Sequence, residues 1–292
     1  MLNVGYVILH YQTIDYTKSA IDSIKEKHGK GKTNIVVVDN ASPNGTGKNL
    51  AELYKDDPQV EVVLSNENVG FARGHNLGIE TLRGKYNCEF IVLLNNDIEL
   101  SSNNWDEIII NKFEQYRYGV LGPDVVSADF EKHGNPSMEQ DLSLSGLRRM
   151  IRIKRLKFFL YSLFPISEKF ENNFKKLIRY KSPAISYKKC ESDRTNVQLQ
   201  GSCLILSPNF FEHYSKLFDK TFLYFEEAIL KYQCEKKNMF CMYTPDLSMI
   251  HKGGISVNGE QLNKRKNKLF YLKHSLNSCK ALYSMMLQEK SK

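Results

Sequence analysis

The first half of the chain alternates short runs of apolar, mostly β-branched residues with segments of helical periodicity. A strand that is apolar along nearly its whole length is buried on both faces, which is typical of a parallel sheet with helices above and below it. We therefore predict an α/β fold with a Rossmann-like, mostly parallel central sheet and helices on both faces. The expected strands are 4–9, 34–38, 60–64 and 90–94, and the expected helices are 16–27, 48–54 and 73–82.

The second half of the chain contains fewer such elements. A strand is expected over 197–206, helices over 210–217 and 226–238, and a last short strand that ends at Ile250.

Several residue types favour structural roles. Trp105 lies at an expected helix start, where packing is favoured over stacking on a ligand. His75, His133 and His274 have no partners at metal-ligand spacing, so we expect them to be structural or exposed. The six cysteines form no C-x-x-C pair, which favours reduced thiols over disulfides or a zinc site.

Polar side chains follow each expected strand of the first half, at 10–11, 39–42, 66–73 and 95–97. In open α/β sheets, ligands bind at the carboxyl ends of the strands. The loops after these strands are therefore the predicted ligand site.

Two carboxylates in these loops allow two interpretations each. Asp97 follows a buried strand, where it can ligate a divalent cation that carries a diphosphate, since hard cations prefer oxygen ligands. The alternative is that Asn-Asn-Asp is a turn that caps the next helix. Asp39 is either part of a turn or an acceptor of hydrogen bonds from a base N–H or a ribose hydroxyl.

The segment 66–78 is rich in glycine and contains Arg73. Glycines permit close approach of the backbone to a ligand, the guanidinium fork suits phosphate, and the following helix N-terminus favours anions. The segment matches neither the dinucleotide fingerprint nor the G-x-x-x-x-G-K-[ST] phosphate loop.

Six motifs in this order resemble those of family 2 glycosyltransferases, especially the branch that includes bacterial rhamnosyltransferases. Together they cover about residues 3–256, apart from roughly 130–195. The motifs are Val-Asp-Asn-Ala-Ser at 38–42, Asn-Val-Gly-Phe-Ala-Arg-Gly-His-Asn-Leu-Gly-Ile at 68–79, Leu-Leu-Asn-Asn-Asp at 93–97, Gln-Gly-Ser-Cys-Leu-Ile at 200–205, Phe-Leu-Tyr-Phe-Glu-Glu at 222–227 and His-Lys-Gly-Gly-Ile-Ser at 251–256.

This resemblance implies a GT-A fold, a nucleoside-diphosphate-sugar donor, a divalent metal (Mg²⁺ or Mn²⁺) and inversion at the anomeric carbon. We divide the chain accordingly. The expected parts are a nucleotide-sugar-binding half at 1–125, a basic, partly amphipathic helical insert at 126–195, an acceptor-binding and catalytic half at 196–260, and a C-terminal helical tail at 261–292.

The resemblance also implies roles for individual residues. Asp97 would hold the metal, and His251 would help to grip the metal or the diphosphate. Glu227 would be the catalytic base, and its neighbour Glu226 would bind an acceptor hydroxyl or cap the helix. The residues implied for the nucleotide pocket are His10, Asp39, Asn68, Gly70, Arg73, Asn76 and Asn95.

The chain departs from the family pattern at two motifs. The metal motif, often Asp-x-Asp, is Asn95-Asn96-Asp97, so a single carboxylate serves. The acidic motif, normally Glu-Asp-x-Asp, is Glu226-Glu227-Ala-Ile, which replaces the expected Asp by the longer Glu and lacks the third acid.

The net charge of +8 comes from one segment, since residues 148–181 hold eleven basic and two acidic side chains. Basic and apolar residues recur there, which predicts docking of the protein on an anionic membrane that presents a lipid-linked acceptor. The alternative is that the apolar stripe packs on the catalytic domain or on a second copy in a homodimer. No nucleic-acid module accompanies the basic block, so a nucleic-acid partner is not expected.

No run reaches the roughly 18 apolar residues of a spanning helix, and Asn3 to Leu9 reads as a strand rather than a secretory signal. We therefore expect a cytoplasmic protein, peripheral on the inner face of the plasma membrane. The predicted function is sugar transfer in bacterial surface-glycan synthesis, with dTDP-rhamnose or a UDP-sugar as donor. The alternative is a non-catalytic binding or scaffold protein that keeps the fold at the membrane.

Overall fold

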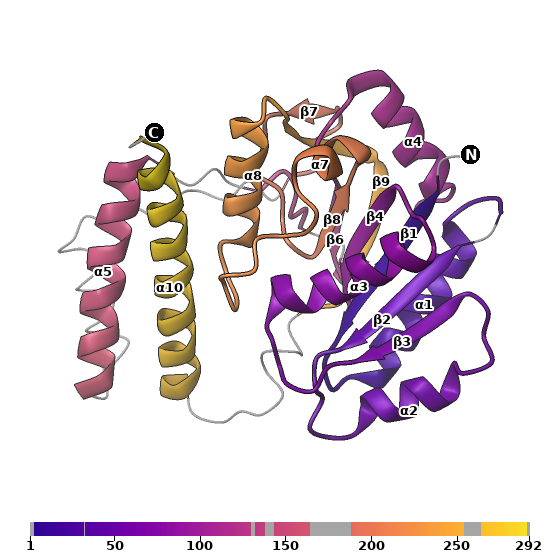
Figure 1. Cartoon of the computed structure of the whole chain (residues 1–292), viewed down its shortest axis with the longest axis horizontal. Coiled ribbons are helices and arrows are strands. Elements are labelled where there is room, and N and C mark those ends of the chain that lie inside the picture. The colour runs from indigo at the N-terminus through magenta and orange to yellow at the C-terminus, as the bar shows by residue number, and fades with distance from the viewer. Residues whose placement is uncertain are drawn as a thin grey trace.

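The computed structural model describes residues 3–31, 33–129, 132–137, 143–163, 188–253 and 264–290. In these residues the strands form one nine-stranded sheet, in the order β3-β2-β1-β4-β8-β6-β9-β5 with β7 beside β9 (Figure 1). The strands are β1 (Val4–His10), β2 (Asn34–Asp39), β3 (Val60–Leu64), β4 (Phe90–Asn95), β5 (Ile98–Leu100), β6 (Val120–Ser127), β7 (Arg194–Thr195), β8 (Cys203–Leu206) and β9 (Cys241–His251). The helices are α1 (Ile14–Lys27), α2 (Thr46–Leu53), α3 (Phe71–Lys85), α4 (Trp105–Tyr116), α5 (Leu144–Leu163), α7 (Pro208–His213), α8 (Glu226–Lys236) and α10 (Lys264–Lys290).

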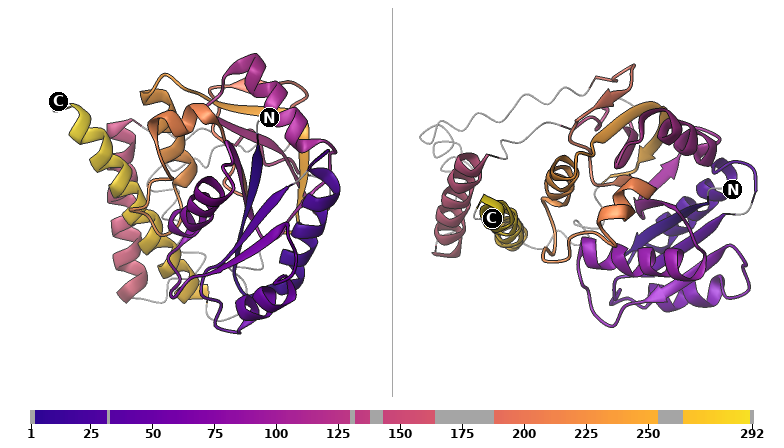
Figure 2. Two further views of the ribbon diagram at one scale, coloured as in Figure 1. Left: turned by 45° about the vertical axis from the view of Figure 1, so that its right-hand side comes forward. Right: turned by 45° about the horizontal axis from the view of Figure 1, so that its top comes forward.

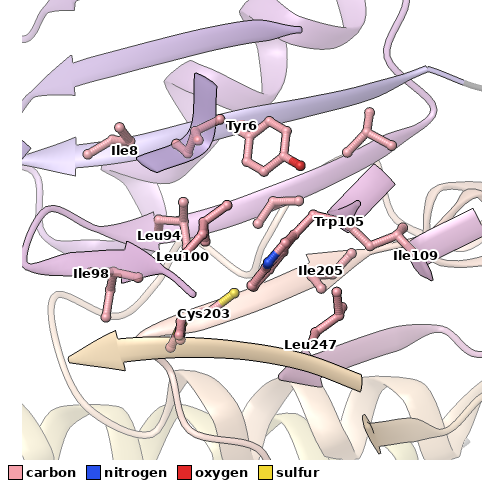
Figure 3. Packing of buried hydrophobic residues seen from close by; sticks show 14 of the residues in the cluster. Tyr6, Ile8, Leu94, Ile98, Leu100, Trp105, Ile109, Cys203, Ile205 and Leu247 are labelled. Atoms are coloured by element: carbon pink, nitrogen blue, oxygen red, sulfur yellow. The ribbon is translucent and has the colours of Figure 1, made fainter. Parts of the chain in front are cut away.

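The first four strands are parallel, as their apolar sequences predict. β1 lies between β2 and β4, and β3 extends the sheet beyond β2. Helices cover both faces: α1, α2 and α4 contribute to one buried cluster, and α3, α7 and α8 contribute to the other. Figure 3 shows Tyr6, Trp105 and Ile205 packed together in the first cluster. Trp105 is fully buried, which confirms its packing role.

The remaining strands make the sheet mixed. β8 is antiparallel to both β4 and β6, β9 is parallel to β6, and β5 is antiparallel to β9. The strand expected over 197–206 is shorter, because side chains bind the backbone before it: Gln200 N donates to Asn135 Oδ1 and Gly201 N to Glu227 Oε1. A side-chain partner leaves these N–H groups unavailable to a neighbouring strand.

The topology brings the polar strand ends to one edge of the sheet. The carboxyl ends of β1–β4, β6 and β9 lie there, and the amino end of β8 joins them because β8 runs in the opposite direction. β6 lies between β8 and β9, so the loop after β6 is placed between the ends of these two strands. This edge is where the sequence predicts the ligand site.

Two long helices stand beside the sheet. α5 packs along α10, and α10 lies between α5 and α8 (Figures 1 and 2). A small buried cluster that contains Leu147 of α5, Ile229 of α8 and Cys279 of α10 joins the pair to the rest of the molecule. Of the described helices, none has the length and apolar character needed to cross a bilayer. The predicted amphipathic pattern at 166–178 lies outside the described residues.

Candidate active site

Asp97 and His251 meet at the sheet edge. β4 ends at Asn95, and after a tight turn Ile98 pairs with His251 in antiparallel register. Lys252 N donates to Asp97 O at 2.9 Å, and the Asp97 Oδ2 and His251 Nε2 atoms are 3.3 Å apart. Asp97 is only 6% exposed, and its Oδ1 is buried without a hydrogen-bond partner.

These two side chains are a suitable donor set for a divalent cation. A buried carboxylate oxygen without a partner is rare in folded proteins and is readily explained by an absent ion. Among the described residues no group of three or more Asp, Glu, His or Cys side chains is placed to hold a metal ion, so this part of the chain offers two ligands at the edge, Asp97 and His251. The remaining ligands of a bound cation would come from a diphosphate and water.

Asp39 is part of a turn, which is one of the two roles that the sequence allows for it. Its Oδ1 accepts hydrogen bonds from Ser42 Oγ at 2.5 Å and from Ser42 N at 3.2 Å. The side chain is 6% exposed and lies 4.0 Å from His10 Nε2. The turn fixes the carboxylate at the edge, where a nucleotide would meet it.

His10 has a different role from the expected one. Its Nδ1 lies 2.6 Å from Thr17 Oγ1 and its Nε2 lies 2.9 Å from Thr46 Oγ1, and the ring is fully buried. Burial lowers the pKa of His10 to about 4, although the Asp39 carboxylate acts in the opposite direction. A neutral ring with both nitrogens bound to hydroxyls holds α1 and α2 to β1.

Asn96 extends the same buried network, and the sequence analysis did not single it out. Its Nδ2 donates to Thr13 Oγ1 at 2.8 Å and to Thr17 Oγ1 at 3.2 Å. Asn96 is 2% exposed, whereas the predicted nucleotide residue Asn95 is half-buried and uses its backbone N to bind Ser202 O. The network therefore connects the turn that carries Asp97 to the loop after β1.

The loop at 66–70 is held by two asparagines. Asn68 Oδ1 accepts from Gly70 N at 3.1 Å, and Asn40 Oδ1 accepts from Val69 N at 2.9 Å while its Nδ2 donates to Gly70 O. Gly70 has φ +84°, and a Cβ there would collide with the carbonyl oxygen of Phe222. This glycine therefore lets the loop pack against the segment before α8.

Arg73 is exposed and lines a pocket of about 440 Å³ beside the end of β3. Asn76 also borders this pocket, but its amide is engaged by the backbone of Leu217, donating to Leu217 O at 3.0 Å and accepting from Leu217 N at 2.9 Å. Asn76 is therefore a structural link between α3 and residue 217 rather than a free nucleotide ligand. Arg73 leaves its guanidinium exposed at this pocket, and its binding of an anion stays a prediction.

Glu226 and Glu227 begin α8, as predicted, but their environments differ. Glu227 Oε1 accepts a hydrogen bond from Gly201 N at 3.1 Å, and burial raises the pKa of this carboxyl. Glu226 lines an apolar pocket with Ala72 and Phe218, and its Oε1 has no partner. Burial, and then the nearby Glu227 carboxylate, raise the pKa of Glu226 to about 8, so this carboxyl is protonated at neutral pH.

The three histidines expected to be structural or exposed are all in contact with the fold. His75 is fully buried and stacks on Phe71, and His274 packs on Phe222. His133, however, has a partner that spacing did not reveal: its Nδ1 lies 2.8 and 2.9 Å from the two carboxylate oxygens of Asp124. All six cysteines are free thiols, as predicted.

Comparisons with known proteins agree with this arrangement. The sequence profile of "Glycosyl transferase family 2" matches residues 6–179. The low-salt glycan biosynthesis hexosyltransferase Agl10 of Haloferax volcanii is 23% identical over 81% of this chain and 63% of that protein. An uncharacterized glycosyltransferase of Haemophilus influenzae is 25% identical over 48% of this chain and 46% of that protein. The chain thus spans less than two thirds of the length of these relatives.

Solved structures share the fold. TarS of S. aureus in complex with UDP superposes with a TM-score of 0.52 at 10% identity, over 91% of this chain and 68% of that one. GalNAc-T7 with UDP, GalNAc and Mn²⁺ superposes with a TM-score of 0.56 at 13% identity, over 90% and 45%. These likenesses confirm the predicted α/β GT-A fold. Because the family profile covers more than half of the sequence, this chain belongs to glycosyl transferase family 2.

Proposed function

We propose that this chain is an inverting, metal-dependent glycosyltransferase that moves a hexose from a nucleoside-diphosphate donor to a glycan or lipid-linked acceptor. One observation carries the proposal: Asp97, with an unpartnered oxygen beside His251, lies at the same sheet edge as the Gly201–Glu227 contact. A leaving diphosphate needs its charge neutralised and an acceptor hydroxyl needs a base, and this edge has a group for each task.

The donor would lie along the loops after β1–β4. Asp97 and His251 would hold Mg²⁺ or Mn²⁺ with the diphosphate, while Arg73 and the loop at 68–70 would line the nucleotide pocket. A bound divalent cation neutralises charge that grows on the leaving diphosphate. Asp39, fixed by its turn, would accept a hydrogen bond from the base or ribose.

Glu227 would take the proton of the acceptor hydroxyl as that oxygen attacks the anomeric carbon. Burial raises the pKa of its carboxyl, which makes the ionised group a stronger base. Its hydrogen bond from Gly201 N fixes the carboxylate at the start of α8, where the acceptor hydroxyl would meet it. Attack from the side opposite to the diphosphate inverts the anomeric carbon.

Two kinds of similarity, in sequence motifs and to known proteins, support our choice of donor sugar. The motifs resemble the rhamnosyltransferase branch, which favours dTDP-rhamnose. The UDP complexes of the structural neighbours and the hexosyltransferase relative favour a UDP-sugar. We place dTDP-rhamnose first and UDP-sugars second, and a surface polysaccharide of bacterial type as the product.

The outer face of α5 supports docking on an anionic membrane. Arg149, Arg152 and Arg155 are exposed in the first part of this helix, and Leu156 and Phe159, with exposed fractions of 46% and 59%, follow on the same side. A basic and apolar face suits the headgroup region of anionic lipid, at about 1 kcal/mol for each basic residue. We therefore place the protein on the inner face of the plasma membrane.

Co-sedimentation with phosphatidylserine-containing and neutral phosphatidylcholine vesicles tests the docking. Arg149→Glu/Arg152→Glu/Arg155→Glu should lose salt-sensitive binding to the anionic vesicles. The control variant reverses three exposed lysines in the first half of the chain, Lys18, Lys30 and Lys48, and should keep this binding. Equal binding to both vesicles contradicts membrane docking, and binding to neither together with a dimer in sedimentation supports a homodimer interface.

The second candidate is a non-catalytic scaffold of the same fold. It is favoured by Ile229, which stands where the family has a third acid and is 2% exposed in the cluster that joins α8 to the helix pair. An acid at this position would be buried among apolar side chains, so Ile229 serves packing of α10 here. Although the chain lacks the family's third acid at position 229, it retains Glu227, the proposed base. We therefore favour a catalytic role over a non-catalytic scaffold.

A thermal-shift screen of UDP, dTDP, GDP and CDP with and without Mn²⁺ tests the donor site. A ligand that binds only the folded state raises stability by roughly 2.7 kcal/mol at a hundredfold excess over its dissociation constant. We expect dTDP or UDP to shift the melting temperature with Mn²⁺. Transfer or hydrolysis of the matching nucleotide sugar separates the enzyme from the scaffold, and no shift with any nucleotide contradicts both.

A further inference from the structure

The pair Asp124 and His133 lies at the active-site edge and has no role in the proposed mechanism. Asp124 is 1% exposed, and both of its carboxylate oxygens face His133 Nδ1, at 2.8 and 2.9 Å. A carboxylate only accepts hydrogen bonds, so Nδ1 carries a proton and Nε2 is the ring nitrogen left for another partner. Among the described residues no side chain or backbone group is hydrogen-bonded to this Nε2.

The backbone fixes the ring in one place. Ser127 N donates to Lys132 O at 2.9 Å, and Gly134 N donates to Val125 O at 2.7 Å. Residue 133 thereby forms an antiparallel bridge with Val126. Residues 132–134 thus pair in antiparallel fashion with the end of β6, and this pairing fixes the position of the histidine.

The position of β6 sets what lies on either side of this histidine. Ser127, at the end of β6, pairs with His251 of β9. On the other side, the residue after His133 lies against Gln200, since a Cβ added at Gly134 would be 2.6 Å from Gln200 Oε1. The residue after Gln200 is Gly201, whose N donates a hydrogen bond to Glu227. His133 is therefore placed between the Asp97–His251 pair and the base.

Asp124 points to the face of the sheet that carries α8. Val125 packs into the opposite core cluster, with α1 and α4, and neighbouring residues of a strand face opposite sides. The dyad thus shares a face with Glu227, whose partner in the reaction is the acceptor hydroxyl. A donor diphosphate at Asp97 would occupy the other end of this edge.

We infer that His133, oriented by Asp124, is an acceptor-binding group whose Nε2 forms a hydrogen bond with a hydroxyl of the acceptor sugar. This inference rests on the proposed function, since it assigns the acceptor side of the same site. An imidazole held by a buried carboxylate presents one ring nitrogen in a fixed direction. A sugar hydroxyl can donate to this nitrogen or accept from it, so the contact selects for the position of that hydroxyl on the sugar ring. His133 would determine acceptor specificity and take no part in proton transfer.

Two substitutions separate binding from a merely structural role. His133→Asn retains a donor near the Nδ1 position for Asp124 and removes the group at Nε2, while His133→Gln retains a polar group near Nε2 and loses the link to Asp124. The control is His213→Asn, at an exposed histidine that ends α7. The probes are p-nitrophenyl glycosides of rhamnose, galactose, glucose and N-acetylglucosamine, measured by saturation-transfer NMR with UDP or dTDP and Mn²⁺.

We expect wild type to bind at least one glycoside and His133→Asn to bind it about tenfold more weakly, the loss typical of one hydrogen bond. The melting temperature and the nucleotide-induced shift should stay unchanged in His133→Asn, and His213→Asn should match wild type. Wild-type glycoside affinity in His133→Asn, or no glycoside bound by wild type, overturns the inference. A weakened nucleotide shift in His133→Asn also overturns it, because His133 then serves the donor. Failure of wild type to respond to any nucleotide instead contradicts the proposed function.

Discussion

The loops of the first half and the segment 222–227 are held in place by different means. The N-terminal loop network, made of His10, Thr17 and Asn96 with their partners, is a set of buried hydrogen bonds among neighbouring strand ends. Segment 222–227, which leads into Glu227, contains two non-glycine residues with positive φ, Tyr224 at 72° and Phe225 at 71°. Backbone in this region is costly and persists only where surrounding contacts impose it.

Those contacts come from a helix far away in the sequence. Ser278 Oγ of α10 donates to Leu223 O at 2.9 Å, and His274 packs on Phe222 with ring centroids 4.6 Å apart. The ammonium group of the half-buried Lys154 of α5 lies 5.5 Å from the ring centre of Phe225. The loops after β1–β4 are thus fixed by local contacts, whereas the position of Glu227, the proposed base, depends on the α5–α10 pair. That pair also carries the proposed membrane face.

The largest effect is expected at Glu227. Glu227→Gln should lower kcat for transfer about a thousandfold, because general-base catalysis contributes on this scale. Nucleotide affinity should stay at the wild-type level. Glu226→Gln should keep transfer, since the amide resembles the protonated acid that occupies this position at neutral pH. If Glu226→Gln loses transfer and Glu227→Gln keeps it, the two roles must be exchanged.

Glu226 should also make stability depend on pH. Its pKa is about 8 in the folded state against an ordinary value of 4.5, so between these values the folded protein holds a proton that the unfolded chain has released. Stability should therefore fall as pH rises from about 4.5 to about 8, by up to roughly 1.4 kcal/mol for each unit. Urea titrations of Glu226→Gln should show a smaller slope, while Glu227 contributes equally to both proteins. A slope equal to wild type contradicts the buried, protonated acid.

Asn96→Ala probes the N-terminal loop network. Removal of the amide deletes its hydrogen bonds to Thr13 Oγ1 and Thr17 Oγ1, which costs about 2 kcal/mol of unfolding free energy, although Thr17 Oγ1 keeps its contact with His10 Nδ1. Because Asn96 precedes Asp97, Mn²⁺-dependent nucleotide binding should weaken as well. An exposed asparagine, Asn49, gives the control Asn49→Ala, which should be silent in both measurements.

Ser278→Ala probes the other region and should have the smallest effect. Loss of its hydrogen bond to Leu223 O costs about 1 kcal/mol of stability and should lower transfer several-fold with unchanged nucleotide affinity. Weaker nucleotide binding in Asn96→Ala but not in Ser278→Ala would show that the two regions are held independently. Equal losses of nucleotide affinity in both variants would contradict that independence.

Much of the sheet was predictable because β1–β4 are apolar runs with helical segments between them. β6 was not singled out, since Gly122-Pro123 in its middle is typical of a turn, and β5 has only three residues. Among the site residues, the proximity of Asp97 and His251 agrees with the motif resemblance. The structural roles of His10 and Asn76 depend on partners such as Leu217, 141 residues away from Asn76, which no local pattern encodes.

The account depends most on Asp97 as the residue that holds the metal and the diphosphate. The direct measurement is the affinity of wild type and Asp97→Asn for UDP and dTDP by isothermal titration, with Mn²⁺ and with EDTA, beside the exposed control Asp56→Asn. Wild type and Asp56→Asn should bind at least one nucleotide more tightly with Mn²⁺, and Asp97→Asn should bind it equally weakly in both conditions while it keeps the wild-type melting temperature. A wild-type Mn²⁺ dependence in Asp97→Asn would contradict the account.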